Sequence, residues 1–235
     1  MLNAASFRKY NLIAGWAVFI FAAIVYCLSI EPTASFWDCG EYIACSYGLE
    51  SGHPPGAPFF LLIAKFFSLF SFGNREHVAA CINTMSALAS AFTVLFLFWS
   101  ITHLAKKVWL KTEEDFSKMK IIIVLAAGAV GALSYAFTDS AWFSAEEGEV
   151  YALSSLFTAI VFWAMLKWEN VADEPHSDRW LIFIAYMVGL SIGVHLLNLL
   201  TIPAMVFIWY FRKRKVSVLG LIITSGVAVA LLGGV

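Results

Sequence analysis

Charged residues are scarce in this chain. Asp, Glu, Lys and Arg make up 13% of its 235 residues, whereas 61% of the residues are hydrophobic. A single soluble core could not bury so much apolar side-chain surface. The composition therefore excludes an ordinary soluble domain and predicts a protein embedded in the lipid bilayer.

Cysteine is also rare, and no charge sign predominates. The four cysteines form no C-x-x-C pair and no cluster with histidine at zinc-ligand spacing, which argues against a disulfide framework or a structural metal. The formal net charge of −1 offers no attraction to nucleic acid, so no such partner is expected.

Long apolar runs, by contrast, occupy much of the chain and predict an all-α, polytopic transmembrane helical bundle. The first run follows Arg8 and Lys9, and at about 20 residues it can span a bilayer. No small-residue cleavage site follows it, so it is expected to be a retained helix. The apolar runs cover residues 11–30, 78–104, 121–137, 150–166, 180–211 and 216–235.

The distribution of basic residues predicts the orientation. Of the 15 Lys and Arg residues, 13 fall into four groups between apolar runs, and the positive-inside rule places these groups and the N-terminus in the cytoplasm. Two extracytoplasmic segments remain, residues 31–77 and 138–149, which hold only two cations. They also hold nine acids: Glu31, Asp38, Glu41, Glu50, Glu76, Asp139, Glu146, Glu147 and Glu149.

The run 180–211 begins and ends beside basic groups, so it must cross an even number of times. Two crossings leave roughly 16 residues each, fewer than the roughly 20 of a full span. The pattern predicts two short helices that meet near Gly193, His195 and Asn198, where protein or a water-filled cavity must satisfy the freed backbone groups.

The last run ends at Val235 without a hydrophilic cap. We expect residues 1–235 to form a single transmembrane domain that is the N-terminal fragment of a longer protein.

The first outer segment is too long for an idle connector. In a helix, Asp38 and Glu41 would share one face. Ser35 and Asp38 also have capping-box spacing, so Asp38 could cap a helix or act in catalysis, and Glu41 could simply be a solvated or ion-paired residue. His53 lies in a Gly-His-Pro-Pro-Gly run and could bind an anion or pass a proton, or belong to a rigid connector.

The second outer segment crowds acids in front of an apolar run. Glu146, Glu147 and Glu149 could line a site for a hydroxyl or a cation, although acids are also favoured at helix N-termini. His195 and Asn198 lie in an apolar stretch, where polar groups either contact a substrate or make hydrogen bonds between helices.

Several segments together suggest a family. The stretches FWDCGEYIA at 36–44, GHPPGAP at 52–58, FSAEEGEVYALSSL at 143–156 and GVHLLNLL at 193–200 resemble a bacterial membrane family long classed as a domain of unknown function. That family is grouped with the protein O-mannosyltransferases of the glycosyltransferase-C superfamily. The run His53-Pro54-Pro55 is similar to a His-Pro-Pro motif in the same loop of O-mannosyltransferases. Those enzymes typically show an adjacent Asp-Glu pair, whereas here two residues separate Asp38 and Glu41.

The resemblance implies a glycosyltransferase-C-like fold with interfacial helices in the first outer loop, one of them expected at 57–72. It also implies an inverting enzyme of the bacterial inner membrane with a periplasmic site. Such an enzyme moves a hexose, for instance mannose, from a polyprenyl-phosphate donor to a Ser or Thr hydroxyl of an exported protein.

In this scheme Asp38 is the expected general base, with Glu41 as its catalytic neighbour. The leaving phosphate needs positive charge or hydrogen-bond donors. The groups available to supply these are His53, Lys65, Arg75 and His195. The sequence identifies no cofactor, although a divalent cation could bind Asp38 together with Glu146 or Glu147.

Two other classes fit the same residues. A transporter would use the broken pair at 180–211 as its substrate site. A noncatalytic lipid-binding subunit would use its acids only as helix caps. Clustering of the ionisable residues in outer loops, rather than at helix midpoints, favours the transferase.

Overall fold

The computed structural model describes residues 3–234, and all its regular elements in that range are helices. The α-helices are α1 (Ala4–Ser29), α2 (Cys39–Gly48), α3 (Pro58–Ser68), α4 (Val78–Trp109), α5 (Lys118–Ala136), α6 (Asp139–Glu146), α7 (Val150–Val171), α8 (Asp178–Ile192), α9 (Ile202–Lys213) and α10 (Val218–Gly233). Short 3-10 helices are η1 (Leu69–Ser71), η2 (Arg75–His77), η3 (Glu113–Asp115) and η4 (Leu196–Thr201). The expected all-α class is confirmed.

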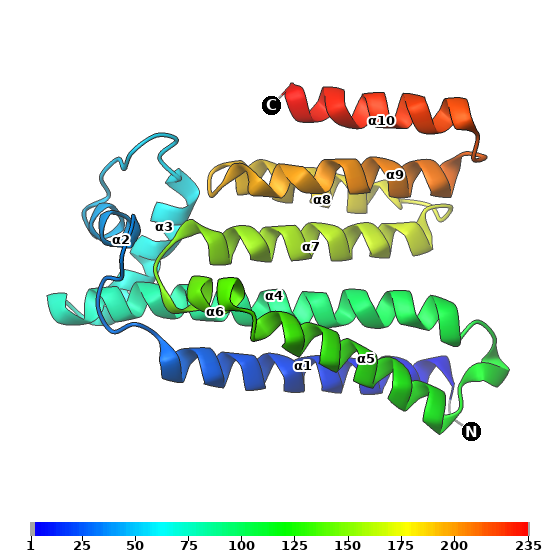
Figure 1. Cartoon of the computed structure of the whole chain (residues 1–235), viewed down its shortest axis with the longest axis horizontal. Coiled ribbons are helices and arrows are strands. Elements are labelled where there is room, and N and C mark those ends of the chain that lie inside the picture. The colour runs from blue at the N-terminus through cyan, green and yellow to red at the C-terminus, as the bar shows by residue number, and fades with distance from the viewer. Residues whose placement is uncertain (1–2, 235) are drawn as a thin grey trace.

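Within residues 3–234, four helices are long and apolar enough to cross a membrane: α1, α4 with η2, α5 and α7. They lie alongside one another and alternate in direction, with α8, α9 and α10 stacked beyond α7 (Figure 1). The helix bounds confirm the predicted runs, although α1 begins several residues before its run and α4 and α7 end several residues after theirs. The chain is therefore a helical membrane protein, as composition predicted.

The central element is α4, whose 32 residues extend about 48 Å along its axis. It packs against α1, α5 and α7, and its buried residues contribute to two hydrophobic clusters. One cluster lies between α1, α4 and α5, and the other joins α4 to α2, α3 and α7. Because α4 contacts both, it ties the outer segment 31–77 to the spanning helices.

The broken helix pair occurs where the sequence predicts it. Helix α8 has 15 residues and ends at Ile192, and α9 has 12 residues and begins after η4. The carbonyl oxygen of Gly193 accepts hydrogen bonds from the backbone N–H groups of Phe59 (2.7 Å) and Phe60 (3.2 Å) at the start of α3. The first outer segment therefore supplies hydrogen-bond donors to the backbone at the break. Such donors are needed because lipid cannot form hydrogen bonds with free backbone groups.

The segment expected as one helix over 57–72 is shorter. Helix α3 begins at Pro58, η1 ends at Ser71, and Phe72 adopts a left-handed backbone with φ of 49°. A left-handed residue cannot continue a right-handed helix, so Phe72 terminates the segment.

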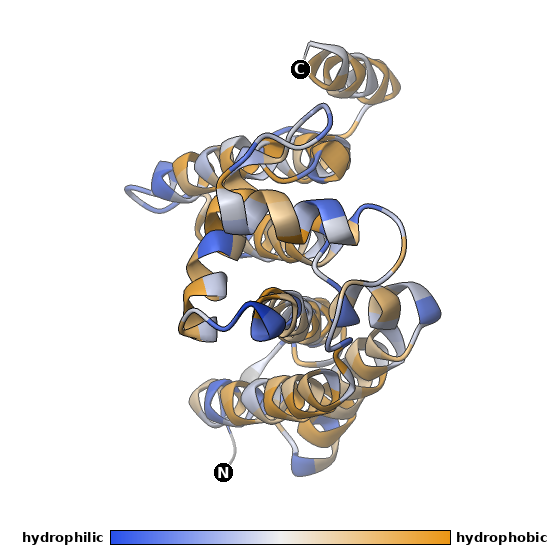
Figure 2. Cartoon of the chain, turned by 90° about the vertical axis from the view of Figure 1, so that its left-hand side faces the viewer, coloured by the Kyte–Doolittle hydropathy of each residue, from blue (hydrophilic) through white to orange (hydrophobic). Residues whose placement is uncertain are grey.

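Both acid-rich segments lie at one end of the bundle, which we call the acidic end (Figure 1). Viewed onto that end, hydrophilic stretches appear among largely hydrophobic helices (Figure 2). The opposite end, here called the basic end, holds the start of α1, the end of α4 and the end of α7.

Candidate active site at the acidic end

A cavity of about 540 Å³ opens at the acidic end. Its walls come from the start of α2, the end of α5, α6 and the start of α7. Acids, hydroxyls and aromatic rings line it, including Trp37, Asp38, Tyr135, Thr138, Ser140, Phe143, Ser144, Glu147, Glu149 and Tyr151. Two segments about 100 residues apart in the chain thus form one pocket.

Hydrogen bonds join the two outer segments. The backbone N–H of Glu31 donates to the carbonyl oxygen of Glu146 at 3.1 Å, and the Ser35 hydroxyl donates to the Glu147 carboxylate. The buried amide Nδ2 of Asn83, on α4, donates to the carbonyl oxygens of Glu31 (2.6 Å) and Thr33 (3.0 Å). These contacts fix the segment that leads into Asp38.

Asp38 stands at the N-terminus of α2 but does not cap it through its side chain. Its backbone carbonyl accepts from the N–H of Tyr42 at 2.9 Å, which starts the helix. The capping-box interpretation is therefore wrong, because Ser35 bonds Glu147 and the Asp38 carboxylate makes no cap hydrogen bond. Asp38 is one of the residues that line the cavity.

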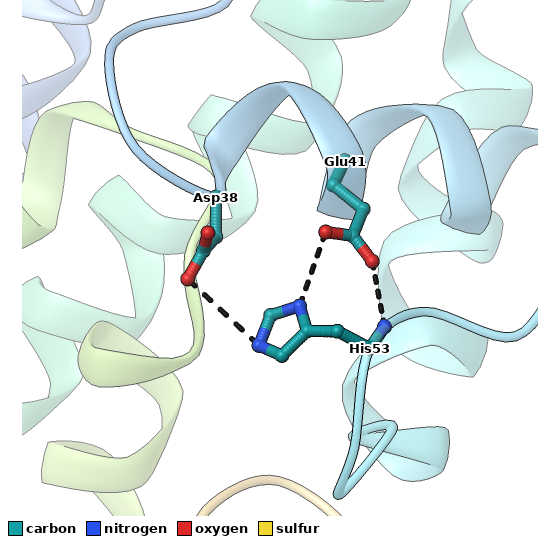
Figure 3. Close-up of side chains that lie close together, drawn as sticks. All are labelled: Asp38, Glu41 and His53. Carbon is teal, nitrogen blue, oxygen red and sulfur yellow. Dashed lines mark hydrogen bonds and ion pairs between the residues drawn. The ribbon is translucent and has the colours of Figure 1, made fainter.

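Glu41 lies one helical turn after Asp38, and both carboxylates point toward the ring of His53 (Figure 3). Glu41 accepts from the backbone N–H of His53 at 2.6 Å and contacts its Nδ1 at 3.1 Å. The opposite ring nitrogen, Nε2, is 3.8 Å from Asp38 Oδ2. Hydrogen bonds from the His53 backbone and side chain lower the pKa of Glu41. Glu41 thus orients the imidazole between the two acids.

The same three side chains could hold a divalent cation. Their ligand atoms lie within 4.8 Å of one another, and all three are exposed. Carboxylate and imidazole ligands suit ions such as Mn²⁺ or Zn²⁺. The grouping differs from the one expected from sequence, which joined Asp38 with Glu146 or Glu147.

Glu147 and Glu149 are buried, with side-chain environments that disfavour charge. They are 2% and 6% exposed. Burial raises the pKa of Glu147, and its charged neighbour Glu146 adds to this, while the bond from Ser35 opposes it. Burial, then the charges of Glu147 and Asp38, raise the pKa of Glu149 to about 7. Neither acid caps α7 with its side chain.

The remaining predicted residues lie outside the cavity lining. Lys65 donates to the Tyr47 carbonyl at 2.5 Å and stacks over the Tyr47 ring. Arg75 is exposed in η2. Glu146 accepts a hydrogen bond from the indole N–H of Trp142.

His195 and Asn198 organise the helix break. His195 Nδ1 accepts from the Leu197 N–H at 3.1 Å, which caps η4, and its ring lies 5.5 Å from that of the cavity residue Tyr151. Asn198 is fully buried and donates to Ser191 Oγ at 2.7 Å. This bond connects η4 to α8. It corresponds to the second of the two roles that the sequence suggested for Asn198, a hydrogen bond between helices.

Sequence reasoning missed Asn83 and Tyr151 and assigned Ser35 only to a cap. Asn83 is a polar residue within a long apolar run, which is the pattern that already drew attention to Asn198. Nothing local in the sequence reveals that Ser35 contacts the second acidic segment, or that Tyr151 contacts His195 at the helix break. Both contacts join distant parts of the chain.

We predict that Asn83→Ala destabilises the protein. The substitution leaves two carbonyl acceptors near a buried position without their donor, a loss of roughly 1–3 kcal/mol. Thermal unfolding in detergent measures it. The control is the neighbouring Thr84→Ala, which removes a hydroxyl bonded only to the Ala80 carbonyl of its own helix, and which we expect to cost about 0.5 kcal/mol or less. Equal melting temperatures for the two variants would contradict the role of Asn83.

The fold and the cavity define a class: a helical membrane protein with an acidic, hydroxyl-lined pocket at one end of its bundle. Residues 38–218 match the family described as the protein O-mannosyl-transferase TMEM260 N-terminal domain, and the chain belongs to this family. It is 26% identical over 191 residues to the protein O-mannosyl-transferase TMEM260 of Mus musculus, covering 81% of this chain and 24% of the relative.

A second relative, the protein O-mannosyl-transferase tmem260 of Dictyostelium discoideum, is 23% identical over 205 residues, covering 85% of this chain and 23% of the relative. The chain thus spans about a quarter of the length of these relatives. No solved structure matches it.

Proposed function

We propose that this chain carries the catalytic cavity of a membrane glycosyltransferase. The enzyme would move a sugar, mannose or another hexose, from a polyprenyl-phosphate donor to a Ser or Thr hydroxyl of an exported protein. The observation that carries the proposal is the convergence of Asp38 with buried Glu147 and Glu149 on one cavity, in a family whose curated members are named O-mannosyltransferases.

The reaction is a single displacement. The acceptor oxygen attacks the anomeric carbon, the bond from that carbon to the phosphate oxygen breaks, and the hydroxyl proton passes to the Asp38 carboxylate. The configuration at the anomeric carbon inverts. Asp38 suits the base role because the residue lines the cavity and its carboxylate makes no cap hydrogen bond.

His53 and Glu41 support Asp38 rather than contact the cavity. Glu41 fixes the His53 ring, and the Nε2 atom of that ring is 3.8 Å from Asp38. A proton accepted by Asp38 could leave through this imidazole, since histidine exchanges protons near neutral pH.

Donor binding would use the other cavity walls. Phe143 and Trp37 are 50% and 86% exposed and offer apolar surface beside the membrane for the polyprenyl chain. The hydroxyls of Ser140 and Tyr151 could donate to the sugar or the leaving phosphate. Lys65 and Arg75 would need to move to reach this phosphate, because neither lines the cavity.

Topology supports a cavity on the periplasmic side of a bacterial inner membrane. The basic groups near Arg8, Lys106 and Lys167 gather at the end opposite the cavity, and the positive-inside rule assigns that end to the cytoplasm. A glycosyltransferase-C-like arrangement, with α2 and α3 as interfacial helices over the spanning bundle, belongs to the same proposal.

The test is transfer by the full-length protein reconstituted in liposomes with polyprenyl-phosphate mannose and a Ser/Thr-containing peptide. We expect the peptide to gain one hexose by mass spectrometry, and exported proteins of a deletion strain to lose one. Movement of the donor across the bilayer without transfer would instead support the transporter alternative.

A chelation series in this assay separates a base from a metal ligand. A cation bound to the Asp38 carboxylate would lower its basicity and so weaken it as a proton acceptor, and the base proposal therefore predicts that transfer survives EDTA. Loss of transfer in EDTA with recovery in Mn²⁺ would reassign Asp38, Glu41 and His53 to a metal site.

A further inference from the structure

A second cavity, of about 810 Å³, lies at the basic end of the bundle. It is bounded by the first turns of α1, the last turns of α4 and the end of α7. Five cations line it, four on these helices and Lys111 in the loop after α4: Arg8, Lys106, Lys107, Lys111 and Lys167. The proposed transferase reaction uses none of them.

Several of these cations have no acidic partner among the described residues. Lys107 pairs with Glu169, but among the described residues no carboxylate lies within ion-pair distance of Arg8, Lys106 or Lys167. Lys106 lies 5.6 Å from the ring of Phe7 and Lys167 lies 5.2 Å from the ring of Trp163. Aromatic faces position an ammonium group without neutralising its charge. The cavity therefore concentrates uncompensated positive charge.

Polar atoms inside the cavity also lack partners. In the part of the chain that the structure describes, His103 Nε2 and Asn11 Oδ1 are buried without a hydrogen-bond partner, and both residues line the cavity. Buried polar atoms are rarely left unsatisfied unless a ligand or water completes them. An imidazole N–H and several ammonium groups together form a set of donors suited to an anion, and Asn11 could accept from a hydroxyl carried by that anion.

The depth of the cavity indicates where such an anion comes from. His103 is six residues before the end of α4 and Lys167 is four before the end of α7, so the cavity reaches roughly 6–9 Å inward from the helix ends. Headgroup phosphates lie at this level of a membrane, and basic pockets between spanning helices recognise them.

We propose that the cavity of Arg8, Lys106, His103 and Lys167 binds a phosphate group, supplied by the headgroup of an anionic phospholipid. This site is separate from the acidic cavity and stands independently of the transferase proposal. Its chemistry is charge-assisted hydrogen bonding from lysine, arginine and histidine to phosphate oxygens.

The experiment compares two variants that each lose two positive charges at the same end. Arg8→Gln with Lys167→Gln removes cavity cations, whereas Lys9→Gln with Lys118→Gln removes exposed cations outside it. Protein in neutral detergent is titrated with short-chain phosphatidylglycerol or inorganic phosphate. Calorimetry and the tryptophan fluorescence of the protein, to which the cavity residue Trp99 contributes, report binding.

We expect saturable binding of phosphatidylglycerol that weakens roughly tenfold in the cavity variant and by less than about twofold in the control. The single variant Lys106→Gln tests the site if the double cavity variant does not fold by thermal melting. Binding of phosphate with no binding of the lipid would assign the site to a soluble phosphate. Equal weakening in cavity and control variants, or no saturable binding of either probe, would overturn the proposal.

Discussion

Asp38→Asn is expected to reduce mannose transfer by about 10²- to 10⁴-fold, the contribution typical of a positioned general base. Asparagine has the size of aspartate but cannot accept the hydroxyl proton. Because Asp38 makes no cap hydrogen bond, the substitution removes little structural support from α2. The measurement is the initial rate of hexose transfer to peptide in liposomes, at matched protein concentration.

The matched control is Asp139→Asn. Asp139 is an exposed acid in the first turn of α6, at the same end of the bundle, and it does not line the cavity. We expect its transfer rate to stay within about twofold of the natural protein. Retained transfer in Asp38→Asn would remove Asp38 as the base, whereas equal losses in both variants would show that negative charge at this end, rather than one proton acceptor, supports activity.

A variant of Glu41 separates support from chemistry. If Glu41 acts by holding His53, then Glu41→Gln keeps one acceptor for the His53 N–H but weakens the contact with Nδ1. We expect a loss of transfer smaller than that of Asp38→Asn, about tenfold, because the imidazole is held less firmly beside Asp38. A loss as large as that of Asp38→Asn would place Glu41 among the reacting groups.

The sequence was informative where the physics is local or set by the bilayer. Run lengths fixed the spanning helices, and the length of 180–211 predicted the break at Gly193 because lipid thickness sets how many residues a helix needs. Two acids three residues apart predicted that Asp38 and Glu41 would share a helix face. Each of these inferences depends only on neighbouring residues and on the membrane.

Tertiary contacts decided the rest. Ser35 at capping-box spacing bonds Glu147 across more than 100 residues, so a local rule gave way to a long-range partner. In the sequence, the basic residues of the four cytoplasmic groups served only to predict the orientation in the membrane. In the structure, some of them converge on one cavity from α1, α4 and α7. Spacing along the chain cannot distinguish a converging set from a dispersed one, because convergence depends on how the helices pack.

Burial of Glu149 is another tertiary effect, and it predicts how stability depends on pH. In the unfolded chain this acid titrates near 4.5, whereas in the folded protein its pKa is about 7. Between these values the folded state keeps a proton that the unfolded state has released. The free energy of unfolding therefore falls as pH rises through this window, by up to about 3 kcal/mol, and levels off above it.

Glu149→Gln is neutral at every pH and should lose this contribution. Between pH 5 and pH 8 we expect the melting temperature of the natural protein to fall further than that of the variant by roughly 5 to 10 °C. Some pH dependence remains in the variant, since burial also raises the pKa of Glu147. Thermal melts in buffers of constant ionic strength measure the difference.

The control for this prediction is Glu76→Gln, which removes an exposed carboxylate from the same end of the bundle. It should melt with the pH dependence of the natural protein. If Glu149→Gln also melts with the pH dependence of the natural protein, then the Glu149 carboxylate is hydrated or ion-paired in solution. The cavity would then hold more water than the burial of Glu149 implies. If only Glu149→Gln flattens the curve, a protonated glutamate lies beside Asp38 below about pH 7 and leaves that carboxylate without a like charge at its side.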